Sequence, residues 1–165
     1  MNLYLVVLGG KIRGANIEMH DVRLVIGKTI ESTLPQLKSE WIGQAKGLHI
    51  DSYKSIHFVD GYKIKILDKA IRKEDEVNRL WLINLGGYKE GEMLEQHRLE
   101  LVVAKSAKTA KSKALKKWKS RVNQIHKDNL LSIDTLQKFT IALEPAPYDS
   151  NDGMKPDWSG YWVIS

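Results

Sequence analysis

The chain contains the same sequence twice, at a constant offset of 77 residues and without a gap. Between Leu3 and Ile66, 17 of 64 positions are identical to the residue found 77 positions later. The repeated residues include glycines, histidines, carboxylates and a tryptophan: Leu8-Gly9-Gly10 with Leu85-Gly86-Gly87, Glu18 with Glu95, His20 with His97, Trp41 with Trp118, His49 with His126, and Asp51 with Asp128. The duplication predicts two copies of one structural unit, so each position can be read twice within a single sequence.

The size and composition of the chain limit the remaining choices. A copy of about 65 residues is small for an independent core, so we expect the two copies to share an interface. The 42% apolar and 28% charged residues are typical of a globular protein, and the absence of cysteine excludes disulfides and thiolate metal sites. The apolar run Leu3–Leu8 is too short for a signal peptide or a membrane span. We therefore expect a cytoplasmic protein with no transmembrane segment, and the sequence leaves a homo-oligomer open.

Each copy opens with two predicted strands. The apolar runs Leu3–Leu8 and Leu80–Leu85 indicate a buried strand. The segments 18–27 and 95–104 alternate between apolar and polar residues, which is typical of a half-buried strand. The polar face of this second strand carries charged residues in both copies, namely Asp21 and Arg23 in the first and Arg98 and Glu100 in the second.

A helix and two further strands complete each predicted unit. We predict helices over Thr29–Gly43 and Ser106–Ser120, with Thr29 and Ser106 as N-caps. In the first copy, Ile30, Leu34, Leu37 and Trp41 form an apolar stripe at helical spacing, so Trp41 and its counterpart Trp118 should be buried. Strands are expected around 48–59 and 62–67, joined by a two-residue hairpin turn at Asp60-Gly61; the second copy has Gln137-Lys138 there.

These elements predict the fold class and the domain organisation. We expect an α+β protein of two tandem ββαββ repeats with pseudo-two-fold symmetry, whose mostly antiparallel sheets are each covered by one helix. The first repeat would span 1–67 and the second 79–143, with a charged linker at 68–78. The C-terminal tail, 144–165, should pack on the core through its aromatic residues, with Gly160–Ile164 as an edge strand.

Several motifs carry a resemblance to a known family. They are Leu-Gly-Gly after the first strand, Asn16-Ile17-Glu18-Met19-His20-Asp21-Val22, Leu48-His49-Ile50-Asp51 and Val59-Asp60-Gly61-Tyr62, with Leu85-Gly86-Gly87-Tyr88 and His126-Lys127-Asp128-Asn129 in the second copy. In these segments the chain resembles the bacterial family called domain of unknown function 1543, whose members have one or two tandem copies. The resemblance covers essentially all of 1–143. It implies membership, and it implies no activity, cofactor or catalytic residue.

Four of the five histidines occupy repeated positions, and each has a repeated carboxylate two residues away. Alternation places Glu18 and His20 on the same strand face as Val22, Leu24 and Ile26, which we expect to face the core. If the strand with His49 lies beside it, each copy would present two imidazoles and two carboxylates. The candidate site residues are thus Glu18, His20, His49, Asp51, Glu95, His97, His126 and Asp128.

Three interpretations of these pairs remain open. The favoured one is a buried hydrogen-bond network, in which a carboxylate fixes the tautomer of a histidine. The second is a small-ligand site or a divalent metal site for zinc, manganese or iron, whose ligands are often imidazoles and carboxylates. The third is general acid–base catalysis. No His-Glu-x-x-His motif favours the metal.

The helix of the second copy is strongly basic. Residues 105–127 include nine Lys or Arg and no Asp or Glu, whereas the first helix has Lys38 against Glu31 and Glu40. A stripe of this kind can bind phosphates, although a solvated lysine face is commoner. Because its apolar side is rich in alanine, we rank nucleic acid above a membrane surface as the partner. The candidate anion-binding residues are Lys105, Lys108, Lys113, Lys116, Lys117 and Arg121.

Together these features favour a non-catalytic cytoplasmic module that binds a ligand or an anionic partner, such as nucleic acid. The alternative is a metal-dependent or acid–base enzyme that uses the repeated Glu/His and His/Asp pairs. No serine, cysteine or lysine stands in a recognisable nucleophile motif.

Overall fold

The computed structural model describes residues 1–68, 77–118, 123–133, 135–136, 139–146 and 151–165. Its strands pair antiparallel, and two short helices accompany them, so the described chain is a mixed α+β protein. It divides into two compact units, one of Met1–His57 with Lys155–Ser165 and one of Phe58–Met154. None of the described helices is long and apolar enough to span a membrane. Residues 69–76, in the charged linker, lie outside the described residues.

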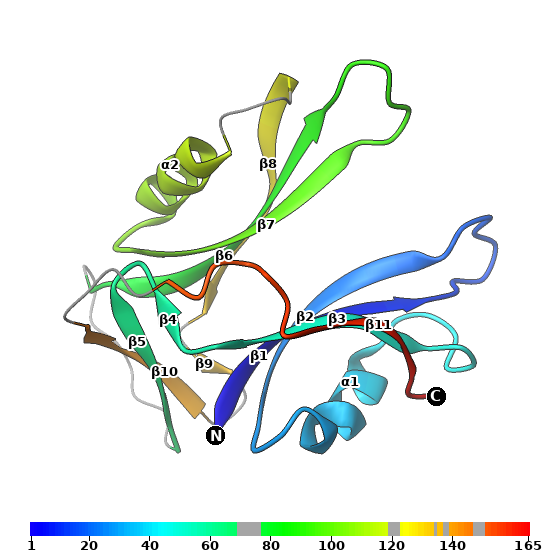
Figure 1. Ribbon diagram of the computed structural model, residues 1–165, viewed down its shortest axis with the longest axis horizontal. Helices are drawn as coiled ribbons and strands as arrows, with labels where there is room; N and C mark the ends of the chain where they lie inside the picture. Colours follow the sequence, from blue (N-terminus) through cyan, green and yellow to red (C-terminus); the bar gives the residue numbers. More distant parts are fainter. Residues whose placement is uncertain (69–76, 119–122, 134, 137–138, 147–150) are drawn as a thin grey trace. The chain divides into compact units, whose positions relative to one another are not determined.

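The first unit is a four-stranded sheet with one short helix (Figure 1). The C-terminal strand β11 supplies its outer edge, so a segment beyond the duplication completes the sheet of the first copy. Going across the sheet, the strands are β11 (Trp158–Val163), β3 (His49–Ile56), β1 (Asn2–Gly10) and β2 (Met19–Gly27).

The core of the first unit lies between this sheet and the helix α1 (Leu34–Glu40). It includes Ile30, Leu37 and Trp41 from the helical segment, packed against Tyr4, Val6, Leu8, Val25 and Ile50 of the strands. Trp158 and Trp162 of β11 pack against the same cluster, and Ile164 belongs to it. The tail thus adds aromatic surface that a 57-residue segment alone lacks.

The first helix is shorter than the segment that the sequence predicts. A 3-10 turn occupies Glu31–Thr33, and α1 begins at Leu34, with Pro35 in its first turn, where the missing N–H of proline costs no hydrogen bond. Thr29 does not cap α1; its hydroxyl accepts a hydrogen bond from the Ser32 N–H at 3.4 Å, within the preceding turn. The helix ends at Glu40, since Trp41 has extended backbone angles.

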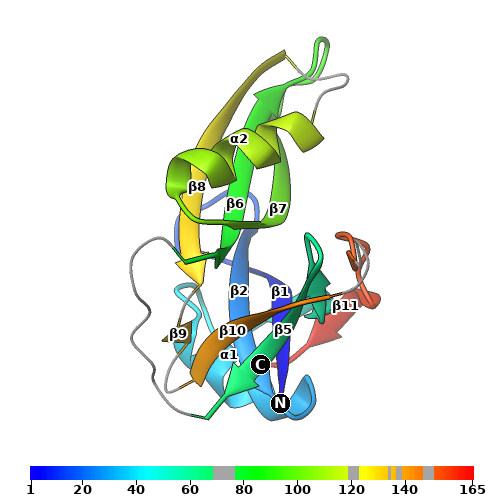
Figure 2. The same ribbon diagram turned by 90° about the vertical axis from the view of Figure 1, so that its left-hand side faces the viewer.

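The second unit contains two sheets and one helix (Figure 2). In one sheet, strands that close the first copy pair with strands that close the second, so the compact units are not the two sequence copies. This sheet has the order β4 (Phe58–Val59), β5 (Tyr62–Leu67), β10 (Phe139–Pro145) and β9 (Thr135–Leu136), and the other has the order β7 (Gln96–Ala104), β6 (Arg79–Tyr88) and β8 (Asn123–Ile133).

Local sequence signals explain two features of this unit. Asp60 and Gly61 both have positive φ, 50° and 77°, and they join β4 to β5 as the predicted two-residue hairpin turn. The helix α2 (Ala107–Lys117) begins after Ser106, whose hydroxyl accepts the Thr109 N–H at 3.3 Å, so the predicted cap is confirmed. Gln137-Lys138 lie outside the described residues.

The two tryptophans occupy equivalent positions, as predicted. Each is the residue directly after the end of its helix, and Trp41 and Trp118 are 9% and 8% exposed. In the second unit, Ala110 and Ala114 of α2 are fully buried against Trp81 and its sheet neighbours.

In both units the helix covers the sheet face that carries the charged pair. The sequence predicts the opposite face, which in the first copy carries Val22, Leu24 and Ile26. In the first unit, Asp21 and Arg23 lie on the side of α1, where Arg23 also approaches Glu40 at 3.8 Å. In the second, Glu100 is 4% exposed and accepts a hydrogen bond from Arg98 at 2.6 Å. The charges are tolerated beside the helix because each carboxylate is paired with an arginine.

Candidate ligand site in the first copy

Gly9 lies between the two histidines of the first copy. It pairs with His20 on β2 and with His49 on β3, so these three residues form one row across the sheet. Residues that are directly opposite in antiparallel strands project from the same face. Because glycine has no side chain, the imidazole of His49 can lie over Gly9; a Cβ there would be 2.3 Å from His49 Nε2 and 2.8 Å from Asp51 Oδ2.

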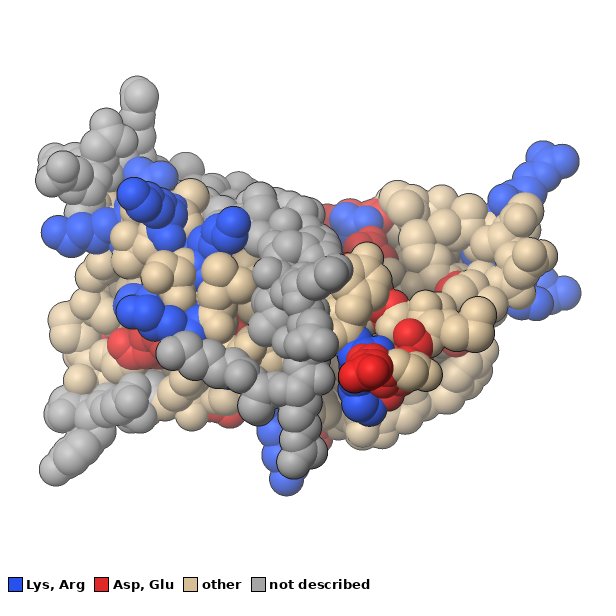
Figure 3. Space-filling view, turned by 90° about the horizontal axis from the view of Figure 1, so that it is seen from above, with Lys and Arg blue, Asp and Glu red and all other residues tan. Residues whose placement is uncertain are grey.

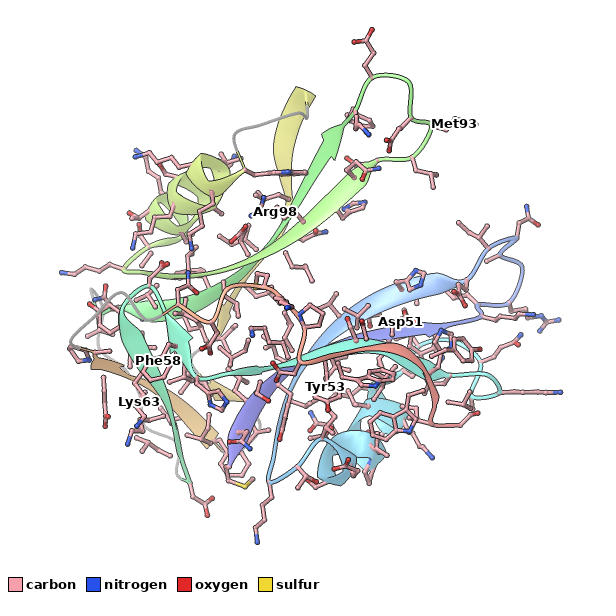
Figure 4. The ribbon with its side chains drawn as sticks, in the orientation of Figure 1. Asp51, Tyr53, Phe58, Lys63, Met93 and Arg98 are labelled. Atoms are coloured by element: carbon pink, nitrogen blue, oxygen red, sulfur yellow. The ribbon has the colours of Figure 1, made fainter. Side chains whose placement is uncertain are left out.

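Asp51 is placed by irregularities on both sides of β3. Against β1 the register shifts so that Val7 faces Ser52 and Leu8 faces Ile50, which leaves Asp51 as the extra residue of a β-bulge. Against β11 the register shifts as well, between Ser159 and Trp162. Bulges redirect a side chain and are frequent beside functional sites. Figure 4 labels Asp51 where β1, β2 and β3 run together.

His49 is buried and held in one orientation. Its side chain is 1% exposed, and its Nδ1 lies 2.8 Å from the Gly47 carbonyl oxygen. A carbonyl can only accept, so Nδ1 carries a proton and Nε2 of the neutral ring is an acceptor. The Tyr161 ring packs on the imidazole, with 4.0 Å between the centroids and 32° between the planes. The ring of His49 is therefore fixed on two sides.

The four expected side chains of the first copy come together. His49 Nε2 lies 3.2 Å from Asp51 Oδ1 and 3.8 Å from Glu18 Oε2, and His20 Nε2 lies 3.3 Å from Asp51 Oδ2 and 3.5 Å from Glu18 Oε1. Each carboxylate thus faces both imidazoles. We call Glu18, His20, His49 and Asp51 the histidine–carboxylate cluster.

The cluster extends from the interior to the surface. His20 and Glu18 are 53% and 43% exposed, whereas His49 is buried, so the two residues lie on the expected strand face but are not enclosed by the core. They do share a face with Leu24 and Ile26, and Ile26 is buried, but the His20 end of β2 is open to solvent. The strand is buried on both faces only at Val25–Gly27, where its apolar alternation ends.

Two buried atoms of the cluster have no hydrogen-bond partner: His49 Nε2 and Asp51 Oδ2. His49 and His20 both lie close to the carboxylate of Asp51, but these contacts do not have hydrogen-bond geometry. Within the described part of the chain, no three His, Cys, Asp or Glu side chains are arranged so that they could hold a metal ion. The cluster therefore presents acceptors rather than a formed metal centre.

The second copy repeats the backbone of this site. Gly86 pairs with both His97 and His126, and Asp128 is again the extra residue of a bulge, because Asn84 faces Asn129 and Leu85 faces Lys127. His97 Nε2 lies 3.4 Å from Glu95 Oε2. The side chains of His126 and Asp128 lie outside the described residues, so the second cluster is placed by its backbone alone.

Sequence analysis did not identify Tyr161 or the Gly47 carbonyl as part of the site. Gly47 has a φ of 82°. A glycine between two predicted elements indicates a turn, but it does not indicate that its carbonyl will contact a histidine. Tyr161 lies outside the duplication, so the comparison of the two copies could not reveal it.

The basic stripe on α2 is partly used for internal contacts. Lys113 Nζ donates to the Val103 carbonyl at 2.6 Å, and Lys117 Nζ donates to Asp60 Oδ1 at 2.9 Å. Asp60 also accepts the Val103 N–H at 2.9 Å, so it ties the β4–β5 turn to β7 and α2. Lys105, Lys108 and Lys116 are exposed, and Arg121 lies outside the described residues. Figure 3 shows blue side chains grouped over α2.

Comparison with known proteins supports the relationship that the motifs indicate. The family described as Domain of Unknown Function (DUF1543) matches the chain twice, at residues 15–66 and 92–143. A solved structure, the protein Il1583 from Idiomarina loihiensis, is 34% identical, with a TM-score of 0.78 over 99% of this chain and 97% of the other. A search of the curated proteins finds no match. The chain therefore belongs to the DUF1543 family and contains two tandem copies of its domain.

Proposed function

We propose that the protein is a non-catalytic binding module whose ligand site is the histidine–carboxylate cluster of the first copy. One observation carries the proposal: His49 Nε2 and Asp51 Oδ2 are buried acceptors without a hydrogen-bond partner. Native proteins satisfy nearly all such groups, and each exception needs a reason. A ligand that donates hydrogen bonds at this point would supply the missing partners.

Energetic cost supports a ligand over a purely structural network. An unsatisfied buried polar group costs about 1–3 kcal/mol, and a network with partners missing is less favourable than an apolar core. The cluster is nevertheless open to solvent at one end, through His20 and Glu18. A network whose only role was to support the fold would gain stability if its acceptors were paired with donors of the chain.

A second function, acid–base catalysis, is favoured by the orientation of His49. Its Nδ1 bonded to a carbonyl leaves Nε2 as a base, which is the tautomer that catalytic histidines use. The two functions are distinguished by the fate of the ligand, which a binding module releases unchanged and an enzyme converts.

An anionic partner at the basic stripe remains a separate prediction. Because Lys113 and Lys117 bind carbonyls and Asp60, only Lys105, Lys108 and Lys116 among the described candidates are left for phosphates. If they bind nucleic acid, affinity should fall steeply with salt concentration, because neutralised phosphates release their counterions. A Lys113→Glu substitution would confound this assay, since Lys113 makes contacts within the fold.

A thermal-shift screen of a small-molecule library tests the proposed function. We expect at least one compound to raise the Tm of the untagged protein, and Asp51→Asn to abolish the shift. The matched control is Asp128→Asn, at the bulge of the second copy, which should leave the shift unchanged. A compound that acts equally on both variants would bind elsewhere, and a library with no active compound would favour the structural network.

A further inference from the structure

The chemistry of the two unpartnered atoms restricts the ligand. With the imidazole of His49 neutral, both are acceptors, because Nδ1 donates to the Gly47 carbonyl and Asp51 is a carboxylate. The ligand must therefore carry hydrogen-bond donors. Both atoms lie within 2.8 Å of the point where a Cβ of Gly9 would stand, so they are close enough together for one donor group to bridge them.

The charge around this point restricts the ligand further. Glu18 and Asp51 each contribute a carboxylate, and within the described chain their ion-pair partners are the two histidines of the cluster. No lysine or arginine of the described residues forms an ion pair with either carboxylate. With both imidazoles neutral, a neutral donor would pair with the acceptors but would leave the negative charge of the two carboxylates uncompensated, whereas a cationic donor satisfies both needs.

An aromatic wall borders the same place. Tyr161 packs on the imidazole of His49, yet it remains 66% exposed. The face of an aromatic ring attracts cations, and the ring also offers apolar surface to the body of a small molecule. Tyr161 is brought here by the shift in register between β11 and β3, which falls opposite Asp51.

Resting on the proposed function, we infer that the ligand binds through a primary ammonium group that donates hydrogen bonds to His49 Nε2 and to the carboxylate of Asp51. The third N–H of the group points toward the carboxylate of Glu18, and the carbon attached to the ammonium lies on the side of Tyr161. An organic cation fits better than a metal ion, because no three side chains of the described residues are arranged to hold a metal.

The test uses three probes on the full chain and follows the imidazole nitrogens of His49 by NMR. Ethylamine at neutral pH carries an ammonium group; tetramethylammonium carries the charge without an N–H; zinc chloride supplies a metal ion. We expect ethylamine to shift the His49 Nε2 signal, with a dissociation constant on the order of 1 mM or weaker for so small a ligand, and tetramethylammonium to have no effect. Lengthening the alkyl chain should tighten binding if Tyr161 contributes apolar surface.

Two substitutions locate the response without relying on buried residues. Glu18→Gln, at a half-exposed side chain, should weaken ethylamine binding roughly two- to fivefold, as expected for an exposed charge pair. Tyr161→Leu should weaken the binding of longer amines more than that of ethylamine. The control, Glu95→Gln in the second copy, should change neither.

The outcomes separate this inference from the proposed function. Equal responses to ethylamine and tetramethylammonium, or a response to zinc alone, would overturn the ammonium assignment while leaving a ligand site at the cluster. A lack of response to all three probes would overturn the inference, and the library screen then decides the proposed function independently.

Discussion

The two copies share a backbone design but differ in what completes it. In both, a glycine of the central strand pairs with two histidines, and an aspartate forms the extra residue of a bulge. Only the sheet of the first copy carries β11 on its outer edge, with Tyr161 packed on His49. The duplicated residues therefore determine the geometry of the strands, while residues outside the duplication complete the surroundings of the histidine–carboxylate cluster in the first copy.

A second difference concerns the charged pairs beneath the helices. Asp21 and Arg23 of the first copy are replaced by Arg98 and Glu100, so the acid and the base have exchanged positions. Both pairs are joined, by Arg23 Nε to Asp21 at 2.8 Å and by Arg98 Nε to Glu100 at 2.6 Å. The exchange changes the order of the two residues but keeps an acid paired with an arginine on this face.

The largest expected effect comes from the buried tryptophans. Trp41→Ala and Trp118→Ala should each lower the free energy of unfolding of their own unit by about 3–5 kcal/mol, because each removes a large side chain from a packed core. The neighbours of Trp118 include Ala110 and Ala114, which have no flexible atoms to fill the cavity, so Trp118→Ala should have the larger effect.

Hydrogen exchange followed by mass spectrometry can measure the two units separately. Loss of protection confined to β1–β3 in Trp41→Ala, and to β6–β8 in Trp118→Ala, would agree with two cores. Equal loss throughout the chain after either substitution would contradict this separation.

The fold was largely predictable because its signals are local or duplicated. The apolar runs predicted β1 and β6, Ser106 predicted the start of α2, and Asp60-Gly61 predicted the hairpin turn. The face covered by the helix was not predictable from alternation, because alternation assigns charged residues to the solvent face. Here Asp21–Arg23 and Arg98–Glu100 lie beneath the helix, where each acid is paired with an arginine. The pairing of β5 with β10 joins residues far apart in sequence, which no local pattern encodes.

The site was predictable only in part, for a related physical reason. Repetition identified Glu18, His20, His49 and Asp51, and the structure brings these four together. Which of them is buried depends on where the strand leaves the core, so His49 is enclosed and His20 is exposed. Tyr161 depends on a long-range strand pairing and could not be assigned from composition.

A glycine substitution sharpens the comparison of the two sites. Gly9→Ala should destabilise the first unit by about 1–3 kcal/mol, because its Cβ would overlap the ring of His49 at 2.3 Å. The same change should abolish the NMR response of His49 to ethylamine. Gly86→Ala is the matched variant: a similar loss of stability would indicate that His126 packs as His49 does, whereas a smaller loss would restrict this packing to the first copy.

The basic helix offers a smaller test of how the copies have diverged. Lys113→Ala with Lys117→Ala should lower the free energy of unfolding of the second unit by about 1 kcal/mol, because contacts with Asp60 and with the carbonyls of β7 are lost. Lys105→Ala with Lys108→Ala removes the same charge from exposed positions and should change it by less than about 0.5 kcal/mol. Urea denaturation of both double variants decides; equal effects would show that the Asp60 contacts contribute nothing.

The smallest expected effect is the pH dependence of the β11 edge, which only the first unit has. Burial raises the pKa of Asp157, but the hydrogen bond from the Ser55 N–H and the charges of Lys54 and His57 outweigh it, so this pKa lies below its usual value. A carboxyl with a depressed pKa in the folded state stabilises that state above the ordinary aspartate value of about 3.9, and this contribution is lost as the pH falls through the lower, folded pKa. We therefore expect acid to loosen β11 before the rest of the sheet, as a shift of the Trp158 indole and Ser55 amide NMR signals below about pH 4.

Asp157→Asn should remove this transition, because the amide does not titrate. The control is Asp152→Asn in the second unit, where the Asp152 carboxylate accepts the Phe58 N–H; this substitution should leave the transition in place. If the transition persists in Asp157→Asn, another group controls the edge strand, and the completed site of the first copy does not depend on this contact.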